Sequence, residues 1–192
     1  DDDSNLSGTQ ILPVTGTSRN ITVRAQIDGT TVAHVQFGDG VFSLSRINTS
    51  FFQGTFEVQH FLPPDNYSVM LVTEGSTAFV NFTYLPLKKF EVFPSVIRVS
   101  ASPGETVSSE SVVVKNTGNI PLNISVRLNE LRGTNGSIST QFAALMFGSA
   151  KKSARGVEFL VLPGAEQQIK LSLNVPHDVL KGKYVSSLIF QD

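Results

Sequence analysis

Short segments in which apolar and polar residues alternate recur along the first half of the chain, separated by turn-forming residues. Alternation with a period of two places apolar side chains on one face of an extended backbone and predicts half-buried β-strands. Glycine, proline, asparagine and aspartate between the segments favour tight turns. The predicted strands are residues 20–27, 31–37, 40–45, 54–61, 67–73 and 78–84.

The second half continues this pattern and begins with a predicted hairpin at residues 95–118. Its turn is the Ser-Pro-Gly-Glu sequence at residues 102–105, and three consecutive valines after it favour a largely buried strand. A polar connection at residues 133–156 contains an apolar segment, residues 141–147, which is expected to be one or two turns of helix or an extra strand on the core. A membrane-inserting or partner-binding loop is the alternative. The predicted strands are residues 90–93, 96–100, 106–115, 120–131, 157–162, 167–175 and 183–190.

Strands at this spacing predict an all-β protein with two antiparallel β-sandwich, Ig-like domains. The best boundary between them is residues 84–89, where a proline and two lysines separate two strand patterns. The predicted organisation is an N-terminal extended arm at 1–18, a first sandwich at 19–86 and a second sandwich at 90–192.

The composition limits the function classes. The 192 residues are 40% hydrophobic and 16% charged with a net charge of −1, so packed cores are expected and a nucleic-acid partner is not. No apolar run is long enough to span a membrane. The absence of cysteine excludes disulfides, thiol catalysis and cysteine-ligated zinc. Since His34, His60 and His177 lack metal-ligand spacing and no catalytic constellation is present, neither an enzyme nor a cofactor is predicted.

N-glycosylation sequons are more frequent than the composition predicts. Seven of the 11 asparagines begin an Asn-X-Ser/Thr sequence, whereas chance would give about two. The excess predicts N-linked glycans and an extracellular, cell-surface location, with a polar β-surface carrying accidental matches as the alternative. Strand parity places several of these asparagines on a solvent face, as glycans require. The predicted glycosylation sites are Asn5, Asn20, Asn48, Asn66, Asn81, Asn123 and Asn135.

Residues 20–85 carry an FGDG sequence at 37–40, then His60, and then a strand that begins after Pro64 with Tyr67. In this order they resemble a polycystic-kidney-disease-type (PKD) repeat. The gap before His60 is long for that family, and Asp65-Asn66 replaces its usual glycine turn. A transthyretin-like or Cna-B-type module is the alternative resemblance. Either resemblance implies a β-sandwich used as a spacer or adhesive module.

Residues 90–190 contain a Phe-Pro pair, the 102–105 turn, a VVKNTGN sequence at 113–119 and a Leu-Pro-Gly turn at 162–164. A Val-Pro pair and the Gly-Lys-Tyr sequence at 182–184 follow. This order resembles Ig-like modules of archaeal and bacterial surface proteins and, more remotely, major sperm protein and pilus chaperone domains. The resemblance implies a fold rather than an activity. The absence of cysteine together with many sequons favours an archaeal surface.

In those Ig-like modules, a final apolar strand normally follows the one that corresponds to residues 183–190. Here the sequence stops at Asp192, so we expect a gap that would leave backbone groups and core side chains exposed. A strand from a partner, or from residues that follow Asp192 in a longer protein, would fill this gap. The predicted acceptor groove is formed by Ile97, Val99, Tyr184, Leu188 and Phe190.

The N-terminal arm is the candidate donor strand. The residues predicted to share its inserting face are Leu6, Gln10, Leu12 and Val14. An arm that pairs within its own domain is an equal alternative. Chaperone–usher pilins and the archaeal filaments called threads join subunits by such donor-strand complementation. The sequence therefore predicts a glycosylated structural protein that polymerises head to tail with other copies of itself into a surface filament or pilus. The alternative is a stalk or adhesin fragment of a larger surface-layer or membrane-anchored protein.

Overall fold

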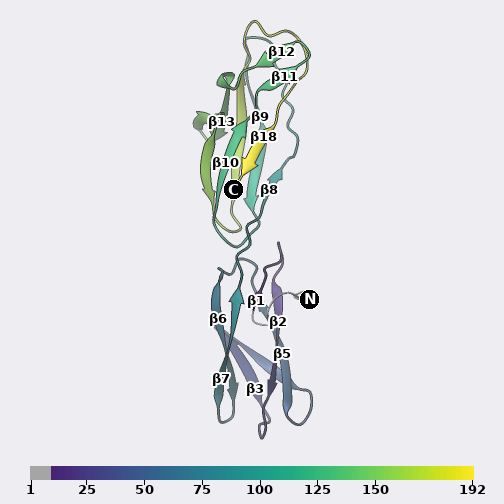
Figure 1. Ribbon diagram of the computed structural model, residues 1–192, viewed down its shortest axis with the longest axis vertical. Helices are drawn as coiled ribbons and strands as arrows, with labels where there is room; N and C mark the ends of the chain where they lie inside the picture. The colour runs from purple at the N-terminus through teal and green to yellow at the C-terminus, as the bar shows by residue number, and fades with distance from the viewer. Residues whose placement is uncertain (1–9) are drawn as a thin grey trace. The chain divides into compact units, whose positions relative to one another are not determined.

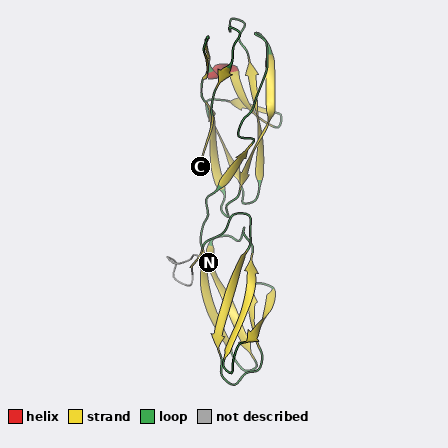
Figure 2. Cartoon of the chain, turned by 90° about the vertical axis from the view of Figure 1, so that its right-hand side faces the viewer, coloured by secondary structure: helices red, strands yellow, loops and turns green. Residues whose placement is uncertain are grey.

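The computed structural model describes residues 10–192, which fold into two compact units. Of the described residues, the first comprises 10–88 and Gly118–Ile120, and the second comprises Lys89–Thr117 and Pro121–Asp192. Strands make up the regular structure of both units, with one short 3-10 helix in the second (Figures 1 and 2). The predicted all-β fold class is confirmed.

The first unit is one seven-stranded sheet with the order β1-β7-β6-β3-β4-β5-β2. All neighbours are antiparallel except β1 and β7, which are parallel. The six strands predicted from alternation correspond to β2–β7, with ends shifted by three residues at most. The strands are β1 (Gln10–Ile11), β2 (Arg19–Gln26), β3 (Ala33–Phe37), β4 (Gly40–Arg46), β5 (Phe51–Val58), β6 (Asp65–Thr73) and β7 (Thr77–Tyr84).

Aromatic rings from four strands meet in the core of the first unit. The ring centroid of Phe37 on β3 lies 5.1 Å from that of Phe56, 5.8 Å from that of Tyr67 and 5.6 Å from that of Phe82. Because aromatic side chains bury large apolar areas, this cluster holds β3, β5, β6 and β7 together. The turn after Phe37 places Gly38 at a φ of 56°, which favours glycine at the first position of a tight hairpin.

Gly54 lies on β5 beside its short contact with β4. The two strands pair only through Ser45–Gln53 and Arg46–Phe52. A Cβ atom on Gly54 would lie 2.9 Å from the backbone oxygen of Ser43 and 2.5 Å from Leu44 Cδ2. A backbone oxygen cannot move aside as the end of a long side chain can, so the close approach of the strands requires glycine here.

Replacing Gly54 by alanine is expected to lower the free energy of unfolding of the first unit by about 2 kcal/mol, because the added methyl forces β4 and β5 apart. Denaturant-induced unfolding, followed by signals from the first unit, measures the change. Gly75→Ala is the matched control, because a Cβ there meets nothing within 4 Å, and it is expected to cost no stability. Equal midpoints for the two variants would show that Gly54 is not required by packing.

The second unit has a five-stranded sheet, β14-β13-β16-β9-β8, and two three-stranded sheets, β15-β10-β18 and β12-β11-β17. All of their strand pairs are antiparallel. The strands are β8 (Phe90–Phe93), β9 (Thr106–Asn116), β10 (Leu122–Leu128), β11 (Leu131–Gly133), β12 (Gly136–Ile138), β13 (Ala143–Phe147), β14 (Ala150–Ser153), β15 (Val157–Val161), β16 (Glu166–Asn174), β17 (Tyr184–Val185) and β18 (Leu188–Gln191).

In the second unit, the sheets that contain β9, β10 and β13 bury side chains toward a common core. Ile124 on β10, Val114 on β9 and Leu145 on β13 are fully buried. The residues that alternate with the buried ones on β10 face solvent or are half-buried. This pattern is typical of two sheets packed face to face over one apolar core.

Two predicted strands are each divided in the structure. Residues 120–131 were predicted as one strand, but they form β10 and β11, and residues 183–190 form β17 and β18. The division occurs because the pairing partners change: β10 pairs with β15 and β18, whereas β11 pairs with β12 and β17. Alternation cannot reveal such a change, since both parts keep an extended backbone.

The region 133–156, predicted as a long connection, is mostly regular structure. It contains β12, the 3-10 helix at Thr140–Phe142, β13 and β14. The helix is capped by Ser139, whose hydroxyl accepts a hydrogen bond from the Gln141 amide. Residues 141–147 therefore include both of the expected forms, the end of a short helix and an extra strand, β13, which pairs with β14 and β16.

Residues 96–100 were predicted as a strand, and this prediction is wrong. Within residues 10–192, none of the paired strands includes this segment. Its burial still alternates, with Ile97 and Val99 half-buried and Val96, Arg98 and Ser100 exposed. The segment therefore has the side-chain pattern of a strand but lacks a neighbouring ladder.

Candidate functional site

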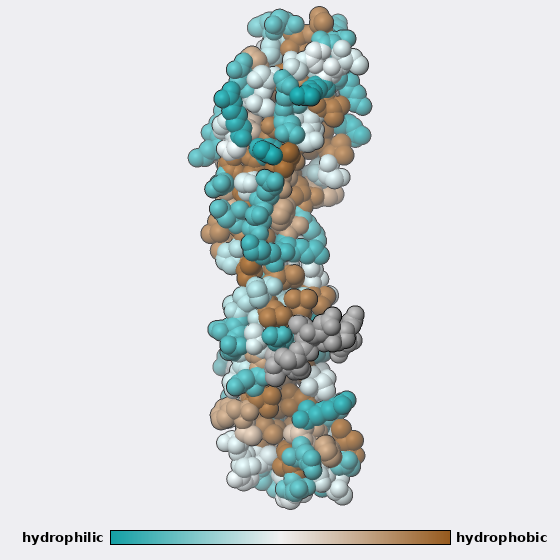
Figure 3. Space-filling view, in the orientation of Figure 1, coloured by the Kyte–Doolittle hydropathy of each residue, from teal (hydrophilic) through white to brown (hydrophobic). Residues whose placement is uncertain are grey.

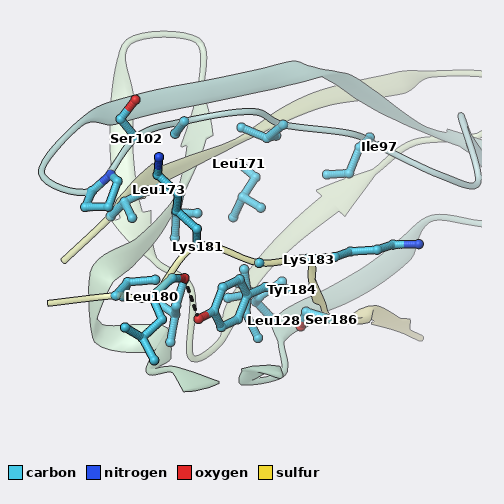
Figure 4. Close-up of a pocket in the computed structure, with 18 of the residues that line it drawn as sticks. Ile97, Ser102, Leu128, Leu171, Leu173, Leu180, Lys181, Lys183, Tyr184 and Ser186 are labelled. Carbon is cyan, nitrogen blue, oxygen red and sulfur yellow. Dashed lines mark hydrogen bonds between the residues drawn. The ribbon is translucent and has the colours of Figure 1, made fainter. Parts of the chain in front are cut away.

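A groove of about 660 Å³ in the second unit brings the unpaired 96–100 segment together with β17 and β18 (Figure 4). Ile97 lies across the groove from Tyr184 and Ser186 (Figure 4), and Val99 and Leu188 also line it. Its lining is mainly aliphatic.

The floor of the groove is the core of the sandwich. Leu171 and Leu173 come from β16 of the five-stranded sheet, and Leu128 comes from β10 of the opposing sheet. Each is at most 8% exposed. A side chain that entered the groove would therefore contact side chains of both sheets.

One end of the groove is bounded by the turn at residues 102–105. The amide of Gly104 donates a 2.8 Å hydrogen bond to the carbonyl of Val175, and the amide of Val175 donates a 2.8 Å hydrogen bond to the backbone carbonyl of Glu105. Pro103 and Val175 both line the groove. These bonds fix the turn to the end of β16 and hold the start of the groove in place.

On the opposite side, a hydrogen bond orients an aromatic ring. The hydroxyl of Tyr184 donates to the carbonyl of Leu180 at 3.0 Å (Figure 4). Gly133 is packed against this part of the chain, because a Cβ on it would lie 2.7 Å from the backbone oxygen of Lys183. Tyr184 is therefore held by its own loop and by β11, with its ring in the lining of the groove.

Four of the five predicted acceptor residues line this groove: Ile97, Val99, Tyr184 and Leu188. Phe190 does not. It shares the parity of Leu188 but lies two residues farther along β18, opposite Val126, outside the lining residues. The sequence did not indicate the leucines of the floor as site residues, because they resemble ordinary core positions of strands.

The described part of the N-terminal arm is paired with its own chain. Gln10 and Ile11 form β1 beside Thr83 and Tyr84 of β7, and the carbonyl of Ile11 accepts a 2.9 Å hydrogen bond from Leu85. For these residues, the alternative of an arm paired within its own domain is the observed one.

The predicted donor side chains of the arm that the structure describes are exposed to solvent. Leu12 and Val14 are 44% and 41% exposed, and Gln10 is exposed, whereas the intervening Pro13 is buried. Leu6 lies outside the described residues. The face predicted to insert into a groove is thus the solvent face of the arm.

Every sequon asparagine that the structure describes is exposed. These residues are Asn20, Asn48, Asn66, Asn81, Asn123 and Asn135, and Asn5 lies outside the described range. By contrast, Asn116 and Asn119, which do not begin sequons, are 0% and 2% exposed. None of the six lines the groove. Glycosylation itself stays a prediction.

The described residues contain no group of three or more histidine, aspartate or glutamate side chains that could hold a metal ion. His60 is buried with its ring against Phe61, at 4.6 Å between centroids. Nearby, burial raises the pKa of Tyr84, whose hydroxyl donates to the carbonyls of Gln59 and His60. These groups have structural contacts. Within residues 10–192, no helix has the length and hydropathy needed to cross a bilayer.

No family model matches the sequence, and no curated protein matches it. Among solved structures, the chain is similar to the CsuC–CsuE chaperone–tip adhesion subunit pre-assembly complex from archaic chaperone-usher Csu pili of Acinetobacter baumannii. The identity is 12% over 95% of this chain and 96% of that chain, with a TM-score of 0.46. It is also similar to a structure of manganese lipoxygenase of Gaeumannomyces graminis with partial zonadhesin of Komagataella pastoris. That match has 9% identity, covers 92% and 84% of the two chains and has a TM-score of 0.23. These values assign neither a family nor a function, and the PKD-type and archaeal resemblances stay predictions.

Proposed function

We propose that this protein is an extracellular, glycosylated structural subunit of a surface filament, and that its groove accepts a β-strand from another copy of the chain. One observation carries the proposal. An apolar groove that reaches the core is flanked by an extended segment, residues 96–100, and by the edge strand β18, and neither has a strand partner on the groove side among the described residues.

A strand suits this groove better than a compact apolar ligand. Small-molecule sites are usually concave pockets with a few convergent polar groups, whereas this groove runs between two extended stretches of backbone. An inserted strand would satisfy backbone donors and acceptors on both sides at once. Its alternate side chains would fill the space above Leu171, Leu173 and Leu128.

The N-terminal arm has the chemistry of a donor. Leu12 and Val14 share one face and are both more than 40% exposed. Each is already more than half buried, so burying the rest would contribute about 1 kcal/mol per side chain. The ladder that holds the arm, β1, consists only of Gln10 and Ile11, so exchange of the arm to a second copy would give up few hydrogen bonds.

Disulfide trapping tests the proposal cleanly, because the chain has no cysteine of its own. Chains with Leu12→Cys and chains with Val99→Cys are mixed under assembly conditions and oxidised. A covalent dimer is expected, since neighbouring strands place Cβ atoms about 4.5–5.5 Å apart, close to disulfide geometry. Val96→Cys is the matched control, because Val96 lies on the outer face of the same segment and should not be trapped.

Electron microscopy of native material provides the second readout, and filaments are expected. If neither filaments nor a Leu12–Val99 dimer form, the filament proposal is wrong. A strand from residues that follow Asp192, found in the groove of a longer gene product, would instead identify a stalk or adhesin fragment of a larger surface protein. β18 is antiparallel to β10, and its second edge has no strand partner within residues 10–192, so a hairpin after it would also reach the groove.

A further inference from the structure

The sequons of Asn66 and Asn81 lie opposite each other on neighbouring antiparallel strands. In the register of β6 and β7, Asn66 is paired with Thr83, and Asn81 is paired with Ser68. The hydroxyl residue of each sequon is therefore beside the asparagine of the other. The hydroxyl of Thr83 donates a 2.6 Å hydrogen bond to Oδ1 of Asn66.

Both sequons lie on the outer face of the sheet. Val69 and Phe82, which point the other way, are 3% and 6% exposed and belong to the core. Because side chains alternate along a strand, Asn66 and Asn81 point to solvent, and both are exposed. A glycan on either residue would start directly above the outer face of this pair of strands.

A large apolar side chain is next to one of these sequons. Phe79 precedes Asn81 by two residues on β7, so the two side chains share a face about 7 Å apart along the strand. Phe79 is 66% exposed, and the half-buried Met70 lies opposite it on β6. Apolar residues reach the surface of the part of the chain that holds these strands (Figure 3). Single exposed apolar residues are common, so the neighbouring sequon is the informative observation.

We propose that the first sugar of an N-glycan on Asn81 packs its apolar C–H face against the ring of Phe79. A pyranose presents weakly positive C–H groups, and an aromatic ring has a negative face, so the two surfaces are complementary. The sugar would remove Phe79 and Met70 from water. The inference rests on the glycosylation included in the proposed function and does not depend on strand donation.

Asn66 provides the matched control within the same pair of strands. The residue two positions before it is Pro64, which has no aromatic ring, and its Oδ1 already accepts the hydrogen bond from Thr83. A sugar on Asn66 therefore has no ring beside it on its own strand. Any stabilisation that depends on Phe79 should be confined to the glycan on Asn81.

The test uses the full chain secreted from a host that N-glycosylates proteins, with its glycans trimmed to the first N-acetylglucosamine. Asn81→Gln, Asn66→Gln and Phe79→Thr, with the double variants, are compared by the thermal midpoint of the first unit. Loss of the Asn81 sugar is expected to lower this midpoint by about 4 °C in the chain with Phe79, and by less than about 1 °C with Phe79→Thr. Loss of the Asn66 sugar should have the same effect in both backgrounds.

Proton NMR gives a readout that does not depend on stability. Sugar protons above an aromatic ring are expected to shift upfield, and Phe79→Thr should abolish the shift. Peptide mass spectrometry reports which sequons are modified. An unmodified Asn81, or equal effects of its sugar with and without Phe79, would overturn the inference. The cysteine trapping between Leu12 and Val99 reads out strand donation separately, so failure of the two ideas can be told apart.

Discussion

Replacing Asn119 by alanine is expected to lower the free energy of unfolding of the first unit by about 3 kcal/mol. Asn119 is 2% exposed and lies in Gly118–Ile120, the tripeptide that belongs to that unit. Its Nδ2 donates hydrogen bonds of 3.1 Å to the carbonyls of Leu62 and Leu85, and its Oδ1 accepts one of 2.7 Å from the amide of Leu87. One side chain thus connects the end of the β5–β6 connection to the segment that follows β7.

The size of the effect follows from the groups that alanine would leave behind. Two carbonyls and one amide would lose their partner, and each buried unsatisfied group costs about 1–3 kcal/mol. The three leucines are half-buried, so water can reach part of the space and the total should fall below the simple sum.

Denaturant-induced unfolding, followed by NMR signals of the first unit, measures the loss for Asn119→Ala. Asn119→Asp should cost at least as much, because it places a carboxylate beside two carbonyl oxygens. Asn129→Ala is the control: Asn129 is exposed, and surface substitutions usually change stability by less than about 0.5 kcal/mol. The interpretation is wrong if Asn119→Ala and Asn129→Ala unfold at the same denaturant concentration.

Several strands of the first unit could be predicted because they have a more buried face and a solvent face, although the first five residues of β7 are all exposed. In β2, half-buried and exposed residues alternate over all eight positions, and period-two alternation is the signal that sequence displays most directly. The same signal misassigned residues 96–100. Alternation reports which side chains are buried, whereas a strand also needs a neighbour for its backbone, and that neighbour is determined by distant parts of the chain.

The buried asparagines were not recognisable from the sequence. Asn116 and Asn119 lie in a KNTGN sequence that predicts the end of a strand, and polar residues there are usually solvated. In the structure, Nδ2 of Asn116 donates to the carbonyl of Val161 at 2.9 Å, and Asn119 connects three leucines. Both roles depend on tertiary partners more than 30 residues away in sequence. The absence of a sequon did not distinguish them either, because Asn129 and Asn174 also begin no sequon and are exposed.

The groove of the second unit was partly predictable for a different reason. Ile97 and Leu188 were identified from the order of strands in Ig-like modules, and both line the groove. The hydrogen bond between Gly104 and Val175 lies at one end of the groove. It joins two segments that are far apart in sequence, and the pattern of apolar and polar residues does not show that they meet. Sequence thus indicated the sides of the groove, and packing determined its floor and its length.

If subunits join through the groove as proposed, replacing Ile97 by glutamate is expected to weaken their association by about 150-fold. Ile97 is half-buried at the side of the groove, and an inserted strand would cover it completely. Burying a carboxylate without a partner costs at least about 3 kcal/mol, which corresponds to this factor. In the single subunit the glutamate can still reach water, so the second unit should fold.

The association constant can be measured by sedimentation of the full chain over a range of concentrations, with circular dichroism to confirm the fold. Val96→Glu is the matched control, because Val96 is 59% exposed on the outer face of the same segment. This variant places the same charge one residue away and should assemble almost normally. Equal assembly of the Ile97→Glu and Val96→Glu chains would contradict the proposed groove, since only the inner face of the segment would contact an inserted strand.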